Sequence, residues 1–186
     1  RVSIQSINKK KIFLSVNDVV KKYDHVVIAT HSDQVKNVLK SQIFDTNLFD
    51  NIKYSRNIVY LHNDETFMPR IRSAWSSWNY IKEDIKNSRM TVTYWMNKLQ
   101  KLKTQQNIFV SLNPYVPPKK KLTFRKMIYE HPIFDFKTFR NQKKIQSIQG
   151  IKNLWFCGAY QGFGFHEDGL NSALNVVSKI LKKTNE

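Results

Sequence analysis

A strand, a glycine-rich turn and a helix follow one another near the end of the chain, and this succession restricts the fold most. The apolar run Leu154 to Cys157 stops at Gly158, and four of the five glycines lie between residues 155 and 170. Apolar residues then recur at helical spacing at Leu170, Ala173, Leu174, Val177 and Leu181. The glycines allow a close approach to the backbone, a positive φ, or an anion at the helix N-terminus. A tight turn alone explains them equally well.

The first fifty residues have a similar α/β character. Residues 1–7 and 12–16 predict a hairpin. Residues 23–30 form a strand pattern with a continuous apolar centre, which is typical of a parallel sheet covered on both faces. His31-Ser32-Asp33 then resembles a helix N-cap, because Val35, Val38 and Leu39 follow at helical spacing.

Residues 51–135 have a different pattern. Strand-like stretches occur at 58–62, 73–80, 90–96, 108–112 and 122–129, with a short helix or turn at 97–102. This pattern predicts a mainly antiparallel sheet inserted into an α/β domain. We therefore expect residues 1–50 and 136–186 to form a nucleotide-binding domain, and residues 51–135 to form a substrate domain.

The net charge of +17 has two interpretations. A basic surface could bind nucleic acid or an anionic membrane, and such a module without catalysis is the alternative function. However, 24 of the 31 basic residues are lysines scattered along the chain, as a compositional bias of the source genome would also produce. The densest group, Lys119 to Lys121, follows two prolines and is more typical of a solvated loop. No pattern of a nucleic-acid-binding motif occurs, so we expect no nucleic-acid partner.

The cysteine count and the lack of long apolar runs restrict the cellular compartment in which the protein is expected. A single cysteine excludes an internal disulfide and fits a reducing compartment. The sequence has no apolar run of 18 residues and opens without a secretory signal pattern. His62 and His131 lack zinc or iron spacing, and we expect no metal site. These features predict a cytoplasmic protein, with peripheral contact to anionic membrane as a further expectation.

Six motifs in order identify a resemblance that covers nearly the whole chain. They are YDHVVIATHSDQV, MPRIRSAWSSWNY, VTYWMNKLQ, VSLNP, YEHPIFD and WFCGAYQGFGFHEDGL. The chain resembles the C-terminal half of flavin-containing amine oxidase-like oxidoreductases, in the amine oxidase, phytoene desaturase and protoporphyrinogen oxidase superfamily. The resemblance implies FAD as cofactor, and a flavoenzyme that removes a hydride as a dehydrogenase, a desaturase or an amine oxidase.

The resemblance also implies a part that this sequence lacks. Such enzymes begin with a Rossmann strand and a G-x-G-x-x-G loop, and no such loop occurs here. The chain moreover opens at Arg1 within a strand pattern. We therefore expect an upstream Rossmann, NAD(P)-binding-like segment of the same protein, without which this part would be inactive.

The resemblance places the cofactor and the substrate at different segments. The expected cofactor-binding residues are Ala29, Thr30, Gly158, Ala159, Gly164, Phe165, His166, Asp168 and Gly169. The expected pocket for an apolar, fatty-acyl or other small-molecule substrate contains Trp75, Trp78, Asn79, Tyr94 and Trp95. Core packing is the alternative for each aromatic, and alternation puts Tyr94 and Met96 opposite Thr93 and Trp95. Asp168 could instead cap the last helix, Cys157 fits a core residue, and no catalytic residue is assigned.

Overall fold

The computed structural model describes residues 2–8, 11–39, 44–82 and 90–184. The chain divides into two compact units. Unit 1 contains Arg1–Ser55 and Pro132–Glu186, and unit 2 contains Arg56–His131. The middle of the chain thus forms a unit of its own between two segments that fold together.

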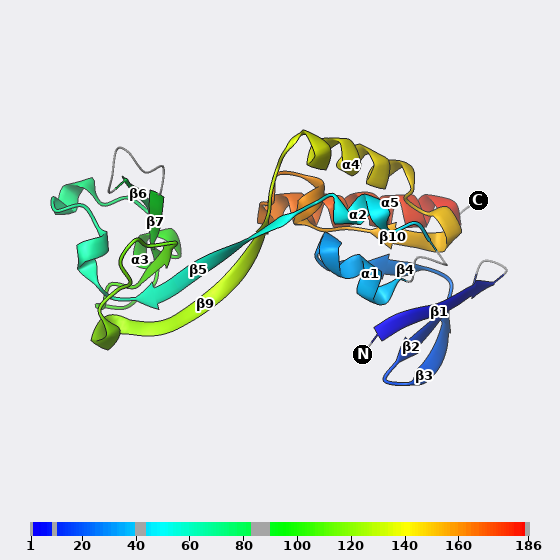
Figure 1. Ribbon diagram of the computed structural model, residues 1–186, viewed down its shortest axis with the longest axis horizontal. Helices are drawn as coiled ribbons and strands as arrows, with labels where there is room; N and C mark the ends of the chain where they lie inside the picture. Colours follow the sequence, from blue (N-terminus) through cyan, green and yellow to red (C-terminus); the bar gives the residue numbers. More distant parts are fainter. Residues whose placement is uncertain (1, 9–10, 40–43, 83–89, 185–186) are drawn as a thin grey trace. The chain divides into compact units, whose positions relative to one another are not determined.

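Unit 1 contains two small sheets (Figure 1). Strands β1 (Val2–Asn8), β2 (Lys11–Val16) and β3 (Val19–Tyr23) pair antiparallel in that order. Strand β4 (Val26–Ile28) pairs in parallel with β10 (Leu154–Phe156), with Ile28 opposite Phe156. The parallel pair therefore joins the first and last parts of the chain.

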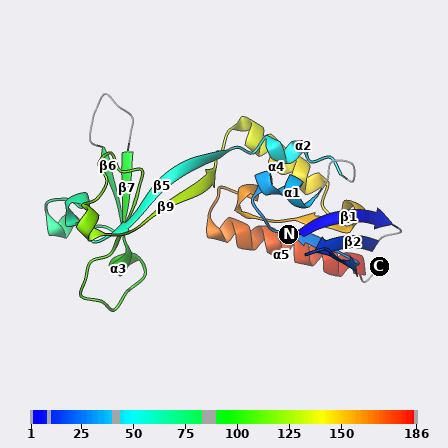
Figure 2. The same cartoon turned by 60° about the horizontal axis from the view of Figure 1, so that its bottom comes forward.

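Helices cover both faces of the parallel pair (Figures 1 and 2). They are α1 (Val35–Val38), α2 (Asn47–Asp50), α4 (Phe136–Ser147) and α5 (His166–Thr184). Leu154 and Phe156 lie in a core shared with residues of α1, α2 and α4. Trp155 and Cys157 point the other way and pack on Val176 of α5. This alternation explains why the run is apolar throughout.

Unit 2 is built on a five-stranded sheet with the order β6-β7-β8-β5-β9. The strands are β5 (Tyr54–His62), β6 (Trp78–Lys82), β7 (Met90–Trp95), β8 (Phe109–Leu112) and β9 (Thr123–Pro132), with the one-turn helix α3 (Met96–Leu99) after β7. Strand β7 pairs antiparallel with β6 and β8, and β8 pairs antiparallel with β5. One face of the sheet packs on Met68 and Trp75 from the 63–77 segment.

The α/β character and the antiparallel sheet predicted from the sequence are confirmed. The boundaries between the two compact units fall after Ser55 and after His131 in the sequence. The domain limits predicted at residues 50 and 135 lie a few residues away. The hairpin at the start is present and is extended by β3, while α4 was not predicted.

Three local predictions are wrong. The strand predicted at 73–80 is present only from Trp78, because Arg72–Ala74 is a 3-10 helix and Asn79 bonds the backbone of Ser76 in a turn before β6. Residues 31–33 form no side-chain cap, since the Ser32 hydroxyl donates to Tyr54 Oη at 3.2 Å. Met96 begins a helix instead of ending the strand.

Candidate functional site

The carboxyl ends of β4 and β10 lie side by side. The amide of Cys157 donates to the carbonyl of Ile28 at 3.1 Å. A Cβ built on Gly158 would lie 3.6 Å from the carbonyl oxygen of Thr30. Because ligands of open parallel sheets bind outside the carboxyl ends of the strands, this edge is the candidate cofactor site. It brings Thr30 of the first segment next to Gly158 of the second, and Ala29 is exposed.

Asp168 determines the shape of the turn between β10 and α5. Its Oδ2 accepts hydrogen bonds from the amides of Phe163 and Phe165, both at 2.9 Å. Asp168 is the third residue of α5, so its side chain reaches back over the helix start as in a capping box. Asp168 thus caps the helix start from its third position, and the prediction that Asp168 is the N-cap residue itself is wrong, because the helix begins two residues earlier. This capping also explains why α5 begins at His166 and not at Gly169.

Two polar side chains that were not predicted hold the same turn. Gln142 of α4 donates to the carbonyls of Tyr160 and Gly162, at 3.0 and 2.7 Å. The Ser172 hydroxyl accepts from the amide of Gly158 at 2.9 Å and donates to the carbonyl of Gly169. Local sequence offers no signal for Gln142, because its partners lie about twenty residues further along the chain.

Neighbouring residues of the chain itself require glycine at two positions of the turn. Gly164 has φ +89°, and a Cβ there would lie 3.0 Å from the Phe134 ring. A Cβ on Gly158 would lie 2.6 Å from the Tyr160 ring. These contacts support the tight-turn interpretation of both residues.

The outer side of the turn exposes Phe163, Phe165 and His166. Beneath it, Tyr160 is buried, and burial raises the pKa of its hydroxyl. Burial also raises the pKa of the Cys157 thiol, which packs against α5. Cys157 therefore stays a neutral core residue, and the exposed groups are the ones that can meet a ligand.

The predicted substrate residues divide between the two faces of the unit 2 sheet. Trp75, Asn79 and Trp95 lie on the face that forms the core; Trp75 is 8% exposed. Trp78 and Tyr94 occupy the other face as an edge-to-face pair, with ring centroids 5.2 Å apart. Trp78 is 45% exposed. Of the five residues only Trp78 is exposed, while Tyr94 and Trp95 are half-buried.

Polar side chains are buried under the inner face. His62 is fully buried; its Nδ1 accepts from the amide of Asp64 at 3.1 Å, so Nε2 carries the proton and lies 2.8 Å from Ser111 Oγ. Ser111 Oγ lies 2.7 Å from Thr93 Oγ1. Burial lowers the pKa of His62 to about 4, which keeps the imidazole neutral at pH 7. The chain of bonds holds β5, β7 and β8 together.

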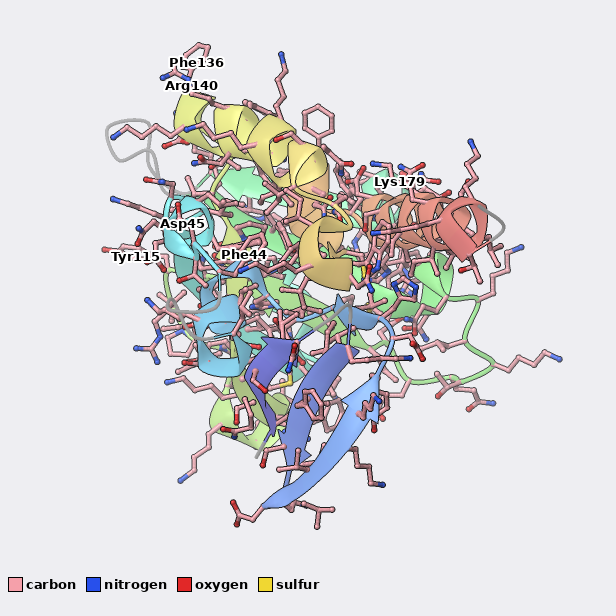
Figure 3. The ribbon with its side chains drawn as sticks, turned by 90° about the vertical axis from the view of Figure 1, so that its right-hand side faces the viewer. Phe44, Asp45, Tyr115, Phe136, Arg140 and Lys179 are labelled. Carbon is pink, nitrogen blue, oxygen red and sulfur yellow. The ribbon has the colours of Figure 1, made fainter. Side chains whose placement is uncertain are left out.

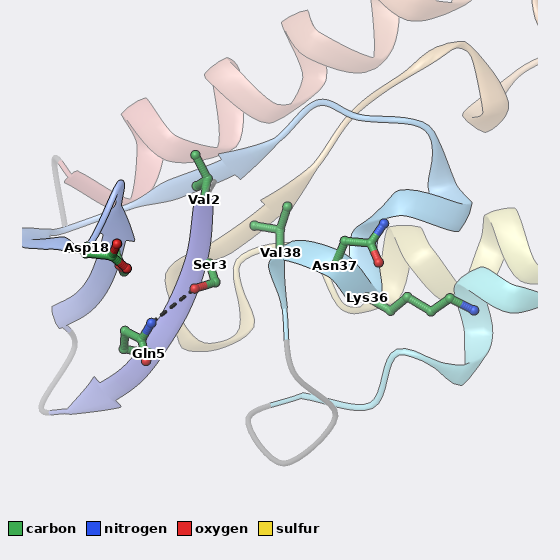
Figure 4. A pocket seen from close by; sticks show the side chains of 8 residues that line it. Val2, Ser3, Gln5, Asp18, Lys36, Asn37 and Val38 are labelled. Carbon is green, nitrogen blue, oxygen red and sulfur yellow. Dashed lines mark hydrogen bonds between the residues drawn. The ribbon is translucent and has the colours of Figure 1, made fainter.

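Each unit has an open cavity away from these predicted residues. In unit 1 a cavity of about 820 Å³ lies between β1 and α1, with Ser3, Gln5 and Lys36 among its lining residues (Figure 4). In unit 2 a cavity of about 470 Å³ is lined by Arg56, Ile58, Tyr60, Met90, Asn113, Pro114 and Tyr115. Neither is lined by Trp78 or Tyr94.

The described residues lack two kinds of feature. They contain no group of three or more histidine, cysteine, aspartate or glutamate side chains placed to hold a metal ion. None of the helices in the described ranges has the length and apolar character needed to cross a bilayer.

The fold matches solved structures of the amine oxidase superfamily. Cyclohexylamine oxidase from Brevibacterium oxydans IH-35A aligns over 100% of this chain with a TM-score of 0.66 and 9% identity. A CLA-producing fatty acid isomerase from P. acnes aligns over 96% with a TM-score of 0.61 and 13% identity. A putative protoporphyrinogen oxidase from Exiguobacterium sp. 255-15 aligns over 96% with a TM-score of 0.59 and 8% identity. The superfamily resemblance is thus confirmed at the level of fold.

The alignments cover only part of each solved structure. The chain spans 49% of the cyclohexylamine oxidase, 47% of the isomerase and 46% of the putative protoporphyrinogen oxidase, which is about half their length. No protein-family model matches the sequence, and no curated protein matches it.

Proposed function

We propose that this chain is the C-terminal part of an FAD-dependent oxidoreductase. The observation that carries the proposal is the shared carboxyl edge of β4 and β10, where Thr30 and Gly158 meet next to the start of α5. The fold supports FAD, because its structural neighbours are flavoenzymes. When bound, the flavin supplies the chemistry of hydride removal from a C–H or C–N bond.

The residues of this edge have different tasks toward the cofactor. Ala29 and Ala159 leave the backbone accessible, and Phe165 and His166 are exposed beside it. Asp168 holds the turn amides, so it positions the turn. Glu167 and Asp168 already place negative charge in the first turn of α5. This charge favours ring atoms and hydroxyl groups over a phosphate at that helix end.

An upstream segment of the same protein would complete the cofactor domain. Leu170, Leu174, Val177 and Leu181 form an exposed aliphatic stripe on α5, away from the face that packs on Trp155. No cation interrupts this stripe, so it suits a protein partner. A Rossmann strand, glycine-rich loop and helix would cover it and hold the FAD pyrophosphate. The coding sequence upstream of Arg1 tests this directly.

The substrate belongs on the outer face of the unit 2 sheet. Trp78, Tyr80 and Tyr94 expose aromatic surface there without a charged neighbour in the cross-strand pairs of β6 and β7 at these positions. Such a surface favours an apolar chain, of which a fatty-acyl group is one example, over a small polar amine. Replacing Trp78 with Ala should change turnover or substrate choice and leave flavin content unchanged.

Flavin occupancy in the full-length protein tests the cofactor proposal. Ala29→Trp places a large side chain at the carboxyl end of β4, where the native residue is exposed, and should deplete bound FAD. Asn175→Trp, at an exposed position of α5, is the matched control and should retain it. Flavin absorbance per protein is measured together with a thermal melt. Full occupancy in a folded Ala29→Trp protein would show that this edge does not bind the flavin.

A further inference from the structure

The outer side of α4 carries aromatic and basic residues together. The helix buries residues 138, 141 and 145. Phe136, Phe139, Arg140 and Lys143 recur three, four and seven residues apart on the opposite side. Phe136 is 93% exposed, and Figure 3 shows it with Arg140 at the outer side of the helix. A phenylalanine this exposed contributes nothing to the core of unit 1.

The aromatic surface continues from α4 onto the glycine-rich turn. The ring centroids of Phe139 and Phe163 are 5.8 Å apart. The centroid of the Phe134 ring lies 6.4 Å from that of Phe139 and 6.5 Å from that of Phe163. Phe163 is itself exposed. We call the following set the aromatic–basic surface: Phe136, Phe139, Phe163, Lys137, Arg140 and Lys143.

The charged residues of α4 itself all have one sign, while exposed carboxylates lie on the neighbouring elements at Asp45, Asp50 and Glu167. Residues 136–152 contain five lysines or arginines and no acidic residue. The carboxylate of Asp135, just before the helix, accepts from the amide and the hydroxyl of Thr138 at 2.7 and 3.0 Å. Glu167 is the exposed acid nearest in sequence to the turn aromatics. A protein covering Phe136 would have to bury these cations or match them with acids. Lipid phosphates supply the matching charge without that cost.

We propose that the aromatic–basic surface docks the protein on anionic membrane. Phe136 enters the boundary between headgroups and acyl chains, and Lys137, Arg140 and Lys143 lie at the phosphate level, as on interfacial amphipathic helices. The inference does not depend on the flavin proposal, because it uses only the charge and exposure of α4 and its neighbouring turn.

Co-sedimentation of the full-length protein with vesicles tests the proposal. The vesicles are pure phosphatidylcholine, or phosphatidylcholine with about one third phosphatidylglycerol. The charge variant is Lys137→Gln/Arg140→Gln/Lys143→Gln, and its matched control is Lys119→Gln/Lys120→Gln/Lys121→Gln in unit 2. The apolar variant is Phe136→Ser, and its control is Tyr115→Ser, since Tyr115 is 65% exposed on unit 2.

We expect binding to the anionic vesicles only. The α4 charge variant should lose on the order of a hundred-fold in partition coefficient, because each basic residue at the surface contributes about 1 kcal/mol. Phe136→Ser should also weaken binding, and the two unit 2 controls should not. Equal losses in both charge variants would mean that net charge alone acts. Unchanged binding in the α4 variants, or α4-dependent binding to duplex DNA in place of vesicles, would overturn the proposal.

Discussion

The glycine-rich turn of unit 1 and the sheet of unit 2 use polar side chains in opposite ways. In the turn, Asp168 and Gln142 hold backbone groups while Phe163 and Phe165 face solvent. In the sheet, His62 and its hydroxyl partners are buried, and the opposite face exposes aromatic rings. A turn held through its backbone keeps one geometry when its side chains change. A sheet held through buried side chains leaves its outer face free to vary. The proposed function assigns the cofactor to the first region and the substrate to the second.

The largest effect should distinguish the two faces of the sheet. Trp75→Ala should lower the free energy of unfolding by about 3–5 kcal/mol, because it removes a buried ring that packs edge-on against Trp95 and Phe109. Trp78→Ala should cost about 1 kcal/mol or less, since its partner Tyr94 keeps the strand pairing. Urea unfolding measures both. Similar losses for the two variants would remove the distinction between core and outer face.

Acid should destabilise the sheet through His62. Its pKa is about 4 in the folded protein and near 6.5 when unfolded, so the unfolded state binds the proton more tightly. The stabilisation is therefore complete above pH 6.5 and is lost as the pH falls toward 4. The full loss is about 3 kcal/mol.

Thermal melts across this pH range, with two histidine variants, check the assignment. His62→Gln should flatten the dependence between pH 6.5 and 4, whereas His166→Gln, at an exposed position of the turn, should preserve it. A dependence that survives His62→Gln would assign it to other groups.

A smaller effect is expected from the carboxylate that shapes the turn. Asp168→Ala removes the acceptor of two backbone amides and should cost about 2 kcal/mol. Asp168→Asn keeps an acceptor oxygen and should cost less. Hydrogen exchange at the Phe163 and Phe165 amides reports the local change, because both should exchange faster in Asp168→Ala. Unaltered protection there would show that the turn is held by other contacts.

The smallest effects should have opposite signs at two glycines. Gly164→Ala should cost about 1–2 kcal/mol, because its φ of +89° is unfavourable for a residue with a Cβ. Gly169→Ala should stabilise by about 0.5–1 kcal/mol, since this residue is helical and its new Cβ would meet Ala159 at an ordinary 3.6 Å. Chemical denaturation measures the free energy of unfolding of both variants. A stabilising Gly164→Ala would mean that the turn does not require the left-handed conformation.

The sequence by itself determined the elements whose pattern is local. The apolar run before Gly158 and the helical spacing after Gly169 predicted β10 and α5, and alternation predicted the strands of the inserted sheet. These predictions hold because side-chain periodicity follows directly from backbone geometry. The motifs also indicated a resemblance to enzymes whose solved structures share the fold of this chain. The predictions of turns and short 3-10 segments were less accurate. A side-chain hydrogen bond such as the one from Asn79 to the Ser76 backbone overrides the local strand propensity.

Only the tertiary structure decided which residues meet. It placed Thr30 beside Gly158, attached Gln142 to the turn, and divided five predicted substrate residues between a core face and an open face. It also revealed that Phe136 points away from the core of unit 1. These outcomes depend on strand pairing and on long-range hydrogen bonds. Neither leaves a periodic signal in the sequence, because the free energy of such contacts comes from residues that are adjacent only after the chain has folded.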